Sequence, residues 1–487
     1  MWATEVVVSL VLGLVVVAVG QWVYRWRNPK CDKGTLPPGS MGLPFIGETF
    51  QFFSPSRSLD VPLFLSSRIQ KYGKIFKTSV AGRAVVMSAD PDFNHFILQQ
   101  EGKLVELWYM DSFAELVGQR GPLKEVATAG SLHKNLKKLI QEHIGIESLK
   151  GDLLGFMDRV VNRTLDSWTT GRVEVRSATA KMTMDLSLSI MLGYDPLTTD
   201  PNLSKMFTEF RRGLLSFPLK LPGTVLHSCL QNQKKIITMI TNTMKSKRDQ
   251  RHDSSSSSTA ETPTTGANYD MLDRLIDDEK LQTSVSDRGI GYVMFALLFA
   301  NAETIPAVLT LVMKLLHENP LAMEELVKEN EEILRARESK EGEVTWKEYK
   351  SMNFTMNVIN EILRLNGSLG IIRRAIDDIH VNGYVIPKGW TIAVMPTAVH
   401  MNSDSYEDPL SFNPWRWKGT NASSKNFIPF GGGMRTCVGA DYSRALMAVF
   451  VHVLVTKYRW KTIKGGEVYR APTLQFGDGY YVELSRK

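Results

Sequence analysis

At 487 residues the chain is long enough for about three average domains, and 43% hydrophobic with 22% charged residues is typical of a globular protein. Its three cysteines are odd in number and far apart, so they do not indicate a disulfide framework and they favour a reducing compartment. The 58 Lys and Arg against 51 Asp and Glu give a net charge of +7, an excess that implies no nucleic-acid partner by itself.

The beginning of the chain predicts a membrane anchor. Residues 6–24 are almost wholly apolar, and a helix of about 19 residues is long enough to span a bilayer. Glu5 precedes this segment and Arg25 and Arg27 follow it, so the positive charge places the downstream chain in the cytosol. No small-residue cleavage site follows, which favours a retained anchor over a signal peptide. We therefore predict one N-terminal transmembrane helix within residues 1–27.

Two segments punctuate the remainder. The sequence LPPGSMGLP at 36–44 cannot continue a helix, so we expect 28–47 to be a stiff, proline-rich hinge. The polar, serine-rich segment 252–267 cannot bury enough apolar surface to fold, and it predicts a disordered surface loop rather than a domain boundary. We therefore predict that 48–487 form one domain.

Long helical patterns alternate with short strand pairs in this domain. Helical periodicity covers 61–72, 290–316 and 353–365, and hairpins are indicated at 75–87, 381–384 and 476–480. The pattern predicts a mainly α fold with a small β lobe.

The residues best suited to chemistry are concentrated at 430–439, in the sequence FGGGMRTCVG. Cys437 lies among glycines that let the backbone approach a flat cofactor closely. The apolar helical segment that follows can direct its N-terminal N–H groups and positive dipole end at the sulfur. Arg435 is placed to pair with a cofactor carboxylate. A thiolate ligand to a haem iron requires this arrangement, whereas a lone cysteine would otherwise be interpreted as a packing residue.

The spacing F-x-x-G-x-R-x-C-x-G resembles, position for position, the haem-binding signature of cytochrome P450 monooxygenases. The resemblance implies the P450 fold in 48–487 and a haem b whose iron is ligated by Cys437. Phe430, Gly431 and Gly439 would contact the haem, and Arg435 would bind a propionate. Electrons would come from NADPH through NADPH-cytochrome P450 reductase.

Further cations are expected at the haem propionates. Arg373 is a plausible second one, with Arg374 beside it as the alternative. His133 and Lys137 fall where P450s often carry a Trp-x-x-x-Arg pair, although both residue types differ here. A reductase-docking face could be formed by Lys134, Lys137, Lys138 and Arg444, and the alternative for these residues is a solvated basic surface.

A charged pair on the predicted helix 353–365 is expected to be structural. Glu361 and Arg364 are three residues apart, so they share one helix face and can form an ion pair. Their position matches the Glu-x-x-Arg pair of P450s, and Arg416 lies in a segment resembling the one whose arginine completes that pair. The resemblance implies a buried cluster beneath the haem, in which loss of one partner would be strongly destabilising.

The long helix 290–316 carries the expected proton-relay pair, Glu303 and Thr304. In P450s an acid and an alcohol at this place deliver protons during oxygen activation. Three neighbours depart from the usual pattern: Asn301 replaces a common glycine, Ile305 replaces a common hydroxyl, and Pro306 follows. Proline cannot donate to the carbonyl of residue 302, and that freed oxygen could hold a relay water or reshape the pocket roof.

Apolar side chains on irregular segments suit a hydrophobic pocket, with ordinary packing as the alternative. The candidate pocket residues are Trp108, Phe217, Ala300, Leu369, Ile371 and Phe476.

Stretches such as TLPPGSMGLPFIGET and KYGKIFKTSVAGR resemble plant P450 family 87, and its A branch in particular. The resemblance implies an endoplasmic-reticulum enzyme with a cytosolic catalytic domain. Its expected reaction is cleavage of a sterol side chain to pregnenolone in steroid biosynthesis. Hydroxylation of a triterpene or steroid hormone is the alternative. A haem-thiolate isomerase or lyase needing no reductase, and a non-catalytic haem sensor, are alternatives from other classes.

Overall fold

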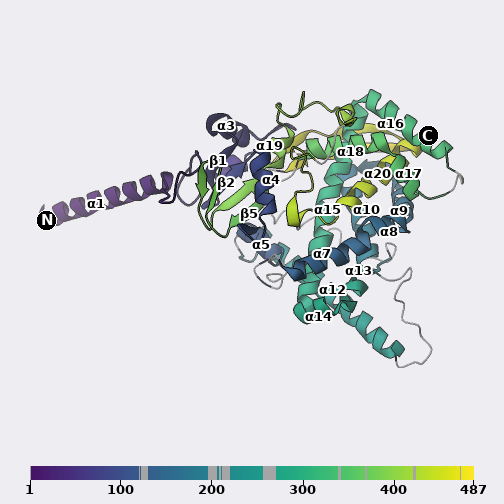
Figure 1. The fold of residues 1–487 in the computed structure, drawn as a ribbon, viewed down its shortest axis with the longest axis horizontal. Coiled ribbons are helices and arrows are strands. Elements are labelled where there is room, and N and C mark those ends of the chain that lie inside the picture. Colours follow the sequence, from purple (N-terminus) through teal and green to yellow (C-terminus); the bar gives the residue numbers. More distant parts are fainter. Residues whose placement is uncertain are drawn as a thin grey trace.

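The computed structural model describes residues 2–119, 121, 130–195, 206–207, 210, 220–255, 270–337, 342–367, 370–419, 424–471 and 473–487. Among these, two helices are long and apolar enough to cross a membrane. The first, α1 (Trp2–Arg27), extends away from the body (Figure 1), and none of its apolar window is buried. The second, α15 (Asp287–Glu318), is 61% buried over its window and runs through the helical body, so it is a core helix.

The helical body is organised around α15. It packs against α10 (Val175–Leu192), α12 (Val225–Ser255) and α18 (Asn353–Asn366). A second layer is formed by α20 (Ala440–Lys457), which is buried along most of its length. The helices around α20 and toward the lower edge of Figure 1 are α7 (Ser131–Ile144), α8 (Ile146–Lys150), α9 (Leu153–Ser167), α13 (Met271–Asp277), α14 (Glu279–Ser284), α16 (Pro320–Arg335) and α17 (Trp346–Ser351).

The largest sheet lies on the anchor side of the body (Figure 1). Its strand order is β1-β2-β8-β5-β3, in which β2 and β8 are parallel and the other neighbours are antiparallel. The strands are β1 (Ile75–Val80), β2 (Arg83–Ser88), β3 (Val105–Leu107), β5 (Ile371–Ala375) and β8 (Thr391–Val394). Short helices surround it: α2 (Thr49–Phe52), α3 (Leu63–Tyr72), α4 (Pro91–Gln99), α5 (Asp111–Leu116) and α19 (Pro396–His400).

The described residues form three smaller sheets as well. The first has the order β4-β12-β9, and the others are the pairs β10-β11 and β6-β7. Their bounds are β4 (Arg172–Glu174), β6 (Ile379–Val381), β7 (Tyr384–Ile386), β9 (Tyr458–Gly465), β10 (Val468–Arg470), β11 (Leu474–Phe476) and β12 (Tyr480–Arg486). A mainly α fold with small sheets is therefore confirmed.

Two of the predicted hairpins are confirmed, and one is wrong. β1 and β2 pair across the Ala81–Gly82 turn, and β6 pairs with β7 across Asn382 and Gly383, which both have positive φ. The turn at 476–480 instead joins two sheets, because β11 pairs with β10 whereas β12 pairs with β9 and β4. A turn signal shows where the chain reverses, but it does not identify the partners of the two strands.

The predicted hinge is fastened to the body over its second half. The amide of Lys77 donates to the carbonyl of Pro38 at 2.7 Å, and its ammonium donates to that of Pro37 at 2.7 Å. Gly39 has φ +147°, and a Cβ there would lie 2.0 Å from the Lys77 carbonyl oxygen, so only glycine fits. Of the predicted loop at 252–267, residues 252–255 belong to α12, which continues to Ser255, and residues 256–267 lie outside the described residues.

Removing residues 2–27 tests the anchor. Because no part of the apolar window is buried, the truncated chain should unfold within about 2 °C of the full chain. It should leave the membrane on alkaline carbonate washing, which the full chain resists. Residual peripheral binding is expected from exposed apolar side chains beside the anchor, namely Leu43, Phe45, Ile46, Phe50 and Leu63. Carbonate-resistant membrane binding of the truncated chain would contradict the anchor assignment.

Candidate active site

The loop before α20 holds Cys437 in a fixed backbone frame. The Cys437 amide donates to the Phe430 carbonyl at 3.0 Å, and a short 3-10 turn, η3 (Gly433–Arg435), lies between them. Gly433 has φ +65°, and a Cβ on it would lie 2.0 Å from the Leu98 carbonyl oxygen. Glycine at 433 therefore lets the loop rest directly on the C-terminal end of α4.

The Cys437 side chain is accessible although its surroundings desolvate the thiol. Burial raises the pKa of the Cys437 thiol, while the Gly439 N–H and the charges of Lys137 and Arg444 oppose the increase. The Gly439 N–H and the two cations thus favour the anionic sulfur, as expected, but they lower the pKa of Cys437 by less than burial raises it. A bound metal ion deprotonates a coordinating thiol outright.

Cationic side chains from three elements surround the loop. Arg435 (η3) and Arg373 (β5) have only 8% and 3% of their side chains exposed. Both contact Glu101, a residue that the sequence analysis did not identify. From α7, the Lys137 ammonium donates to the Met434 carbonyl at 3.2 Å, and burial together with Arg435 and Lys137 lowers the pKa of His133 to about 4. The four predicted propionate contacts therefore lie around the cysteine loop.

These residues fit a haem. His133 Nδ1 is buried and makes no hydrogen bond to any described residue, so it remains available for an anionic ligand. Arg373 Nε already lies 2.8 Å from Glu101 Oε2 and adds buried positive charge beside it. A Cβ at Gly439 would meet nothing within 4 Å, and one at Gly431 would meet only the Ile371 side chain at 3.6 Å. An accessible thiol, open space beside two glycines, buried cations and the unpaired His133 nitrogen together suit an iron porphyrin with two carboxylates.

The basic residues expected to form a docking face divide into two kinds. Lys134 and Lys138 are exposed on α7, and Lys138 is 3.5 Å from Glu142. Lys137 instead points to the loop, and the Arg444 guanidinium lies 4.7 Å from the centre of the Phe430 ring. The outward-facing part of the predicted surface is therefore Lys134 and Lys138.

Thr304 lies on an accessible patch of an otherwise buried helix. Ala300 and Thr304 are one turn apart on α15 and are both exposed, whereas most residues before and after them are buried. The Thr304 hydroxyl donates to the Ala300 carbonyl at 2.9 Å. An exposed alanine and threonine in the middle of a core helix suit a face that opens onto a substrate site.

Glu303 faces a different direction from Thr304. Its carboxylate is 3.8 Å from the Arg176 guanidinium of α10, and both residues line a cavity of about 360 Å³. Asn301 donates to the Ser187 hydroxyl at 3.1 Å, so the residue that replaces a glycine ties α15 to α10. Ile305 and Pro306 are buried, and α15 continues through the proline as one helix.

The six predicted pocket residues do not all gather in one place. Trp108 lines a cavity of about 570 Å³ over the large sheet, where Arg374 stacks on its ring at 4.3 Å. Phe476 lines the cavity that contains Glu303. Ala300 is on the Thr304 patch, and Ile371 is near Gly431. The remaining two, Phe217 and Leu369, lie outside the described residues.

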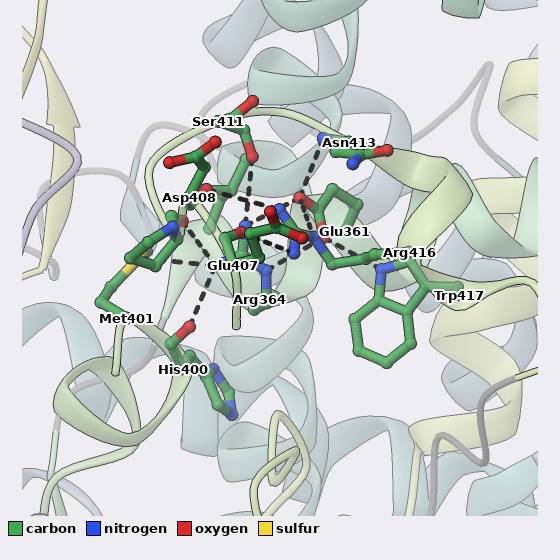
Figure 2. Close-up of polar contacts among 12 residues, drawn as sticks. Glu361, Arg364, His400, Met401, Glu407, Asp408, Ser411, Asn413, Arg416 and Trp417 are labelled. Carbon is green, nitrogen blue, oxygen red and sulfur yellow. Dashed lines mark hydrogen bonds and ion pairs between the residues drawn. The ribbon is translucent and has the colours of Figure 1, made fainter. Parts of the chain in front are cut away.

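A buried ion-pair cluster lies at the C-terminal end of α18 (Figure 2). Arg364 donates to both oxygens of Glu361, at 2.9 and 2.7 Å, and both side chains are fully buried. Arg416 donates to Glu361 at 3.1 Å, and the Trp417 indole donates to it at 3.0 Å. Arg364 also donates to the backbone carbonyls of His400, Pro409 and Ser411. The cluster thus joins α18 to segment 400–417, a mostly irregular segment that starts at the end of α19, ends in a 3-10 turn, η2 (Pro414–Trp417), and precedes the cysteine loop.

Comparison with known proteins decides the family. The cytochrome P450 family model matches residues 37–477. The chain belongs to the cytochrome P450 family. This P450 is 44% identical to "Cytochrome P450 87A3" of Oryza sativa subsp. japonica, over 96% of the chain and 89% of that protein. It is 40% identical to "Beta-amyrin 16-alpha-hydroxylase CYP87D16" of Maesa lanceolata, over 99% of both chains.

A third relative and a solved structure agree with this assignment. "Cucurbitadienol 11-hydroxylase" of Siraitia grosvenorii is 40% identical over 98% of this chain and 99% of its own. The structure "Retinoic acid bound cyanobacterial CYP120A1" superposes with a TM-score of 0.80 at 25% identity, covering 93% of this chain and 99% of that one. The P450 is therefore a plant family 87 monooxygenase with the P450 fold. The family uses haem b on a cysteine thiolate and electrons from NADPH.

Replacing Glu361 tests the buried cluster. Glu361→Gln removes the charge between the buried Arg364 and the partly buried Arg416, so it should lower the free energy of unfolding by about 3–5 kcal/mol. Urea unfolding followed by tryptophan fluorescence measures the change. Glu331→Gln is the control, because its pair with Arg335 is exposed and should contribute less than about 1 kcal/mol. Equal, small changes in both variants would contradict a structural role for the cluster.

Proposed function

We propose that this P450 hydroxylates a sterol or triterpene skeleton at the endoplasmic reticulum membrane, and that the Cys437 thiolate would hold the haem iron. The observation that carries the proposal is the match over 98–99% of the chain to two proteins named as hydroxylases of β-amyrin and cucurbitadienol. Electrons would come from NADPH through NADPH-cytochrome P450 reductase, for which the exposed Lys134 and Lys138 offer positive charge.

Different residues of the chain would bind the haem and deliver the proton. Haem b, when bound, supplies the oxygen activation. Arg435, Arg373, Lys137 and His133 would hold its propionates, and the open space at Gly431 and Gly439 would admit its plane. The Thr304 hydroxyl donates its one hydrogen to the Ala300 carbonyl, so its lone pairs can accept a hydrogen bond from water. It would pass a proton on by turning that hydrogen away from Ala300. We assign Thr304 to proton delivery on the accessible patch.

Glu303 would supply protons from a neighbouring face of α15. Its carboxylate is 20% exposed and its partner Arg176 is 16% exposed, so neither is sealed from water. The long 3.8 Å separation is compatible with a carboxylate that exchanges its arginine partner for a water molecule. In this proposal Glu303 loads the relay from the 360 Å³ cavity, and Thr304 delivers the proton.

Sterol side-chain cleavage to pregnenolone is the second candidate. It rests on the sequence resemblance to the A branch of family 87, and the relative with 44% identity bears an A-branch name. Cleavage requires successive oxidations at neighbouring carbons in one site, whereas hydroxylation requires one. The names of the two triterpene hydroxylases favour the single oxidation.

Product analysis separates these reactions. Microsomes carrying this P450 and a plant P450 reductase are fed β-amyrin, cucurbitadienol, cholesterol and sitosterol, with and without NADPH. Mass spectrometry should detect hydroxylated skeletons that depend on NADPH. Pregnenolone and a released side-chain aldehyde would establish cleavage instead. Conversion without NADPH would contradict a monooxygenase and favour an isomerase or lyase, and inertness toward all four substrates would overturn the proposed substrate class.

Substitution of Thr304 tests proton delivery. Thr304→Val keeps the side-chain volume and removes the hydroxyl, so product formed per NADPH consumed should fall by about tenfold or more while haem content is unchanged. Thr304→Ser retains the hydroxyl and serves as the control, with coupling close to that of the parent. NADPH consumption and product are measured in the same assay. Fully coupled turnover by Thr304→Val would remove Thr304 from the relay.

A further inference from the structure

We infer that Glu101 is a positioning residue for the haem, holding the Arg373 and Arg435 guanidinium groups together and adjusting the charge at the haem edge. The inference rests on the proposed haem site, and it adds a residue that lies outside the haem-binding signature and the acid–alcohol pair. We call Glu101, Arg373 and Arg435 the haem-edge cluster.

Glu101 is almost fully enclosed between the two arginines. Its side chain is 1% exposed, with Oε2 at 2.8 Å from Arg373 Nε and Oε1 at 3.0 Å from Arg435 Nε. Oε1 also accepts a hydrogen bond from the Leu107 amide at 3.0 Å. At 2.8 Å the Glu101 carboxylate and the Arg373 guanidinium form a close, buried ion pair. The carboxylate therefore holds Arg373 through its Nε edge, while Arg373 Nη1 donates to the Ile372 carbonyl at 2.9 Å.

Three chain segments bring the haem-edge cluster together. Glu101 lies two residues beyond α4, whose end carries the Leu98 carbonyl that fixes Gly433 in the cysteine loop. Arg373 is directly opposite Leu107 in the β3–β5 register. A single carboxylate thus fastens the cysteine loop to the large sheet at the position where both arginines must face a propionate. Burial lowers the pKa of Arg373, and the negative charge of Glu101 acts against this decrease.

The charges around the site also balance. Arg373, Arg435 and Lys137 are positive, Glu101 is negative, and His133 is neutral at pH 7 because its pKa is about 4. The excess of positive charge then equals the charge of two haem propionates. Without Glu101 the site would retain one uncompensated positive charge after haem binding. Buried, uncompensated positive charge near the iron favours the ferrous form over the ferric form.

The test uses the purified holoenzyme and three variants. Glu101→Gln removes the charge and the ionic bridge, whereas Glu101→Asp keeps the charge but is one methylene shorter and cannot reach both arginines. Glu106→Gln is the matched control, because Glu106 is on β3 and pairs with Arg374 on the exposed side of the same strand pair. Two quantities are measured: the ferric–ferrous reduction potential, and the rate at which haem transfers to apomyoglobin.

We expect Glu101→Gln to shift the ferric–ferrous equilibrium about tenfold toward ferrous, which is about 59 mV for one electron. Haem should transfer about tenfold faster from both Glu101 variants. Glu101→Asp should keep a potential close to that of the parent, and Glu106→Gln should change neither quantity. If Glu101 only supported folding, Glu101→Gln and Glu101→Asp would have the same reduction potential.

Parent-like potential and haem transfer in Glu101→Gln would overturn the inference, as would an equal shift of the potential in Glu106→Gln. If Glu101→Gln fails to retain haem, the faster transfer expected of Glu101→Asp decides the question. Both readouts need haem but no substrate. Failure of the proposed sterol or triterpene hydroxylation would therefore leave this test intact, and the parent's carbon monoxide spectrum reports separately whether the thiolate ligand is present.

Discussion

A carboxylate can be buried as an anion only when positive groups and hydrogen-bond donors surround it. This constraint determines how the segments around Glu361 and Glu101 pack. Glu361 is fully buried, and its carboxylate accepts hydrogen bonds from Arg364, Arg416, the Trp417 indole and the Asn413 amide (Figure 2). Arg364 in turn binds three backbone carbonyls of the irregular segment 400–417. A segment with little regular structure is thereby held in one conformation against α18.

The cysteine loop depends on the same kind of interaction on its other side. Glu101 stands between Arg373 and Arg435, so a second buried carboxylate joins the large sheet to the loop. The loop also rests on α4 at Gly433, where a side chain has no room. The cysteine loop thus lies between the Glu101 cluster and the first turn of α20, and α15 presents the accessible Ala300–Thr304 patch.

The sequence predicted the features that depend on residues close together in the chain. The anchor, the helix spacing of Glu361 and Arg364, the Asn382–Gly383 turn and the glycine-rich cysteine loop are all encoded within a few residues. Glu101 could not be identified in this way, because its partners lie 272 and 334 positions away and an acid after a short helix is common. The predicted pairing of β11 with β12 was wrong for the same reason, because strand partners depend on contacts between segments far apart in the sequence.

The central claim is that Cys437 presents a thiolate to iron. X-ray absorption at the iron edge of the purified ferric protein tests it most directly, because sulfur and nitrogen ligands differ in scattering and in bond length. The account predicts one sulfur ligand in the parent protein and none in Cys437→Ser, with haem still bound in the variant. A sulfur ligand that persists in Cys437→Ser, or purely nitrogen and oxygen ligation in the parent, would contradict it.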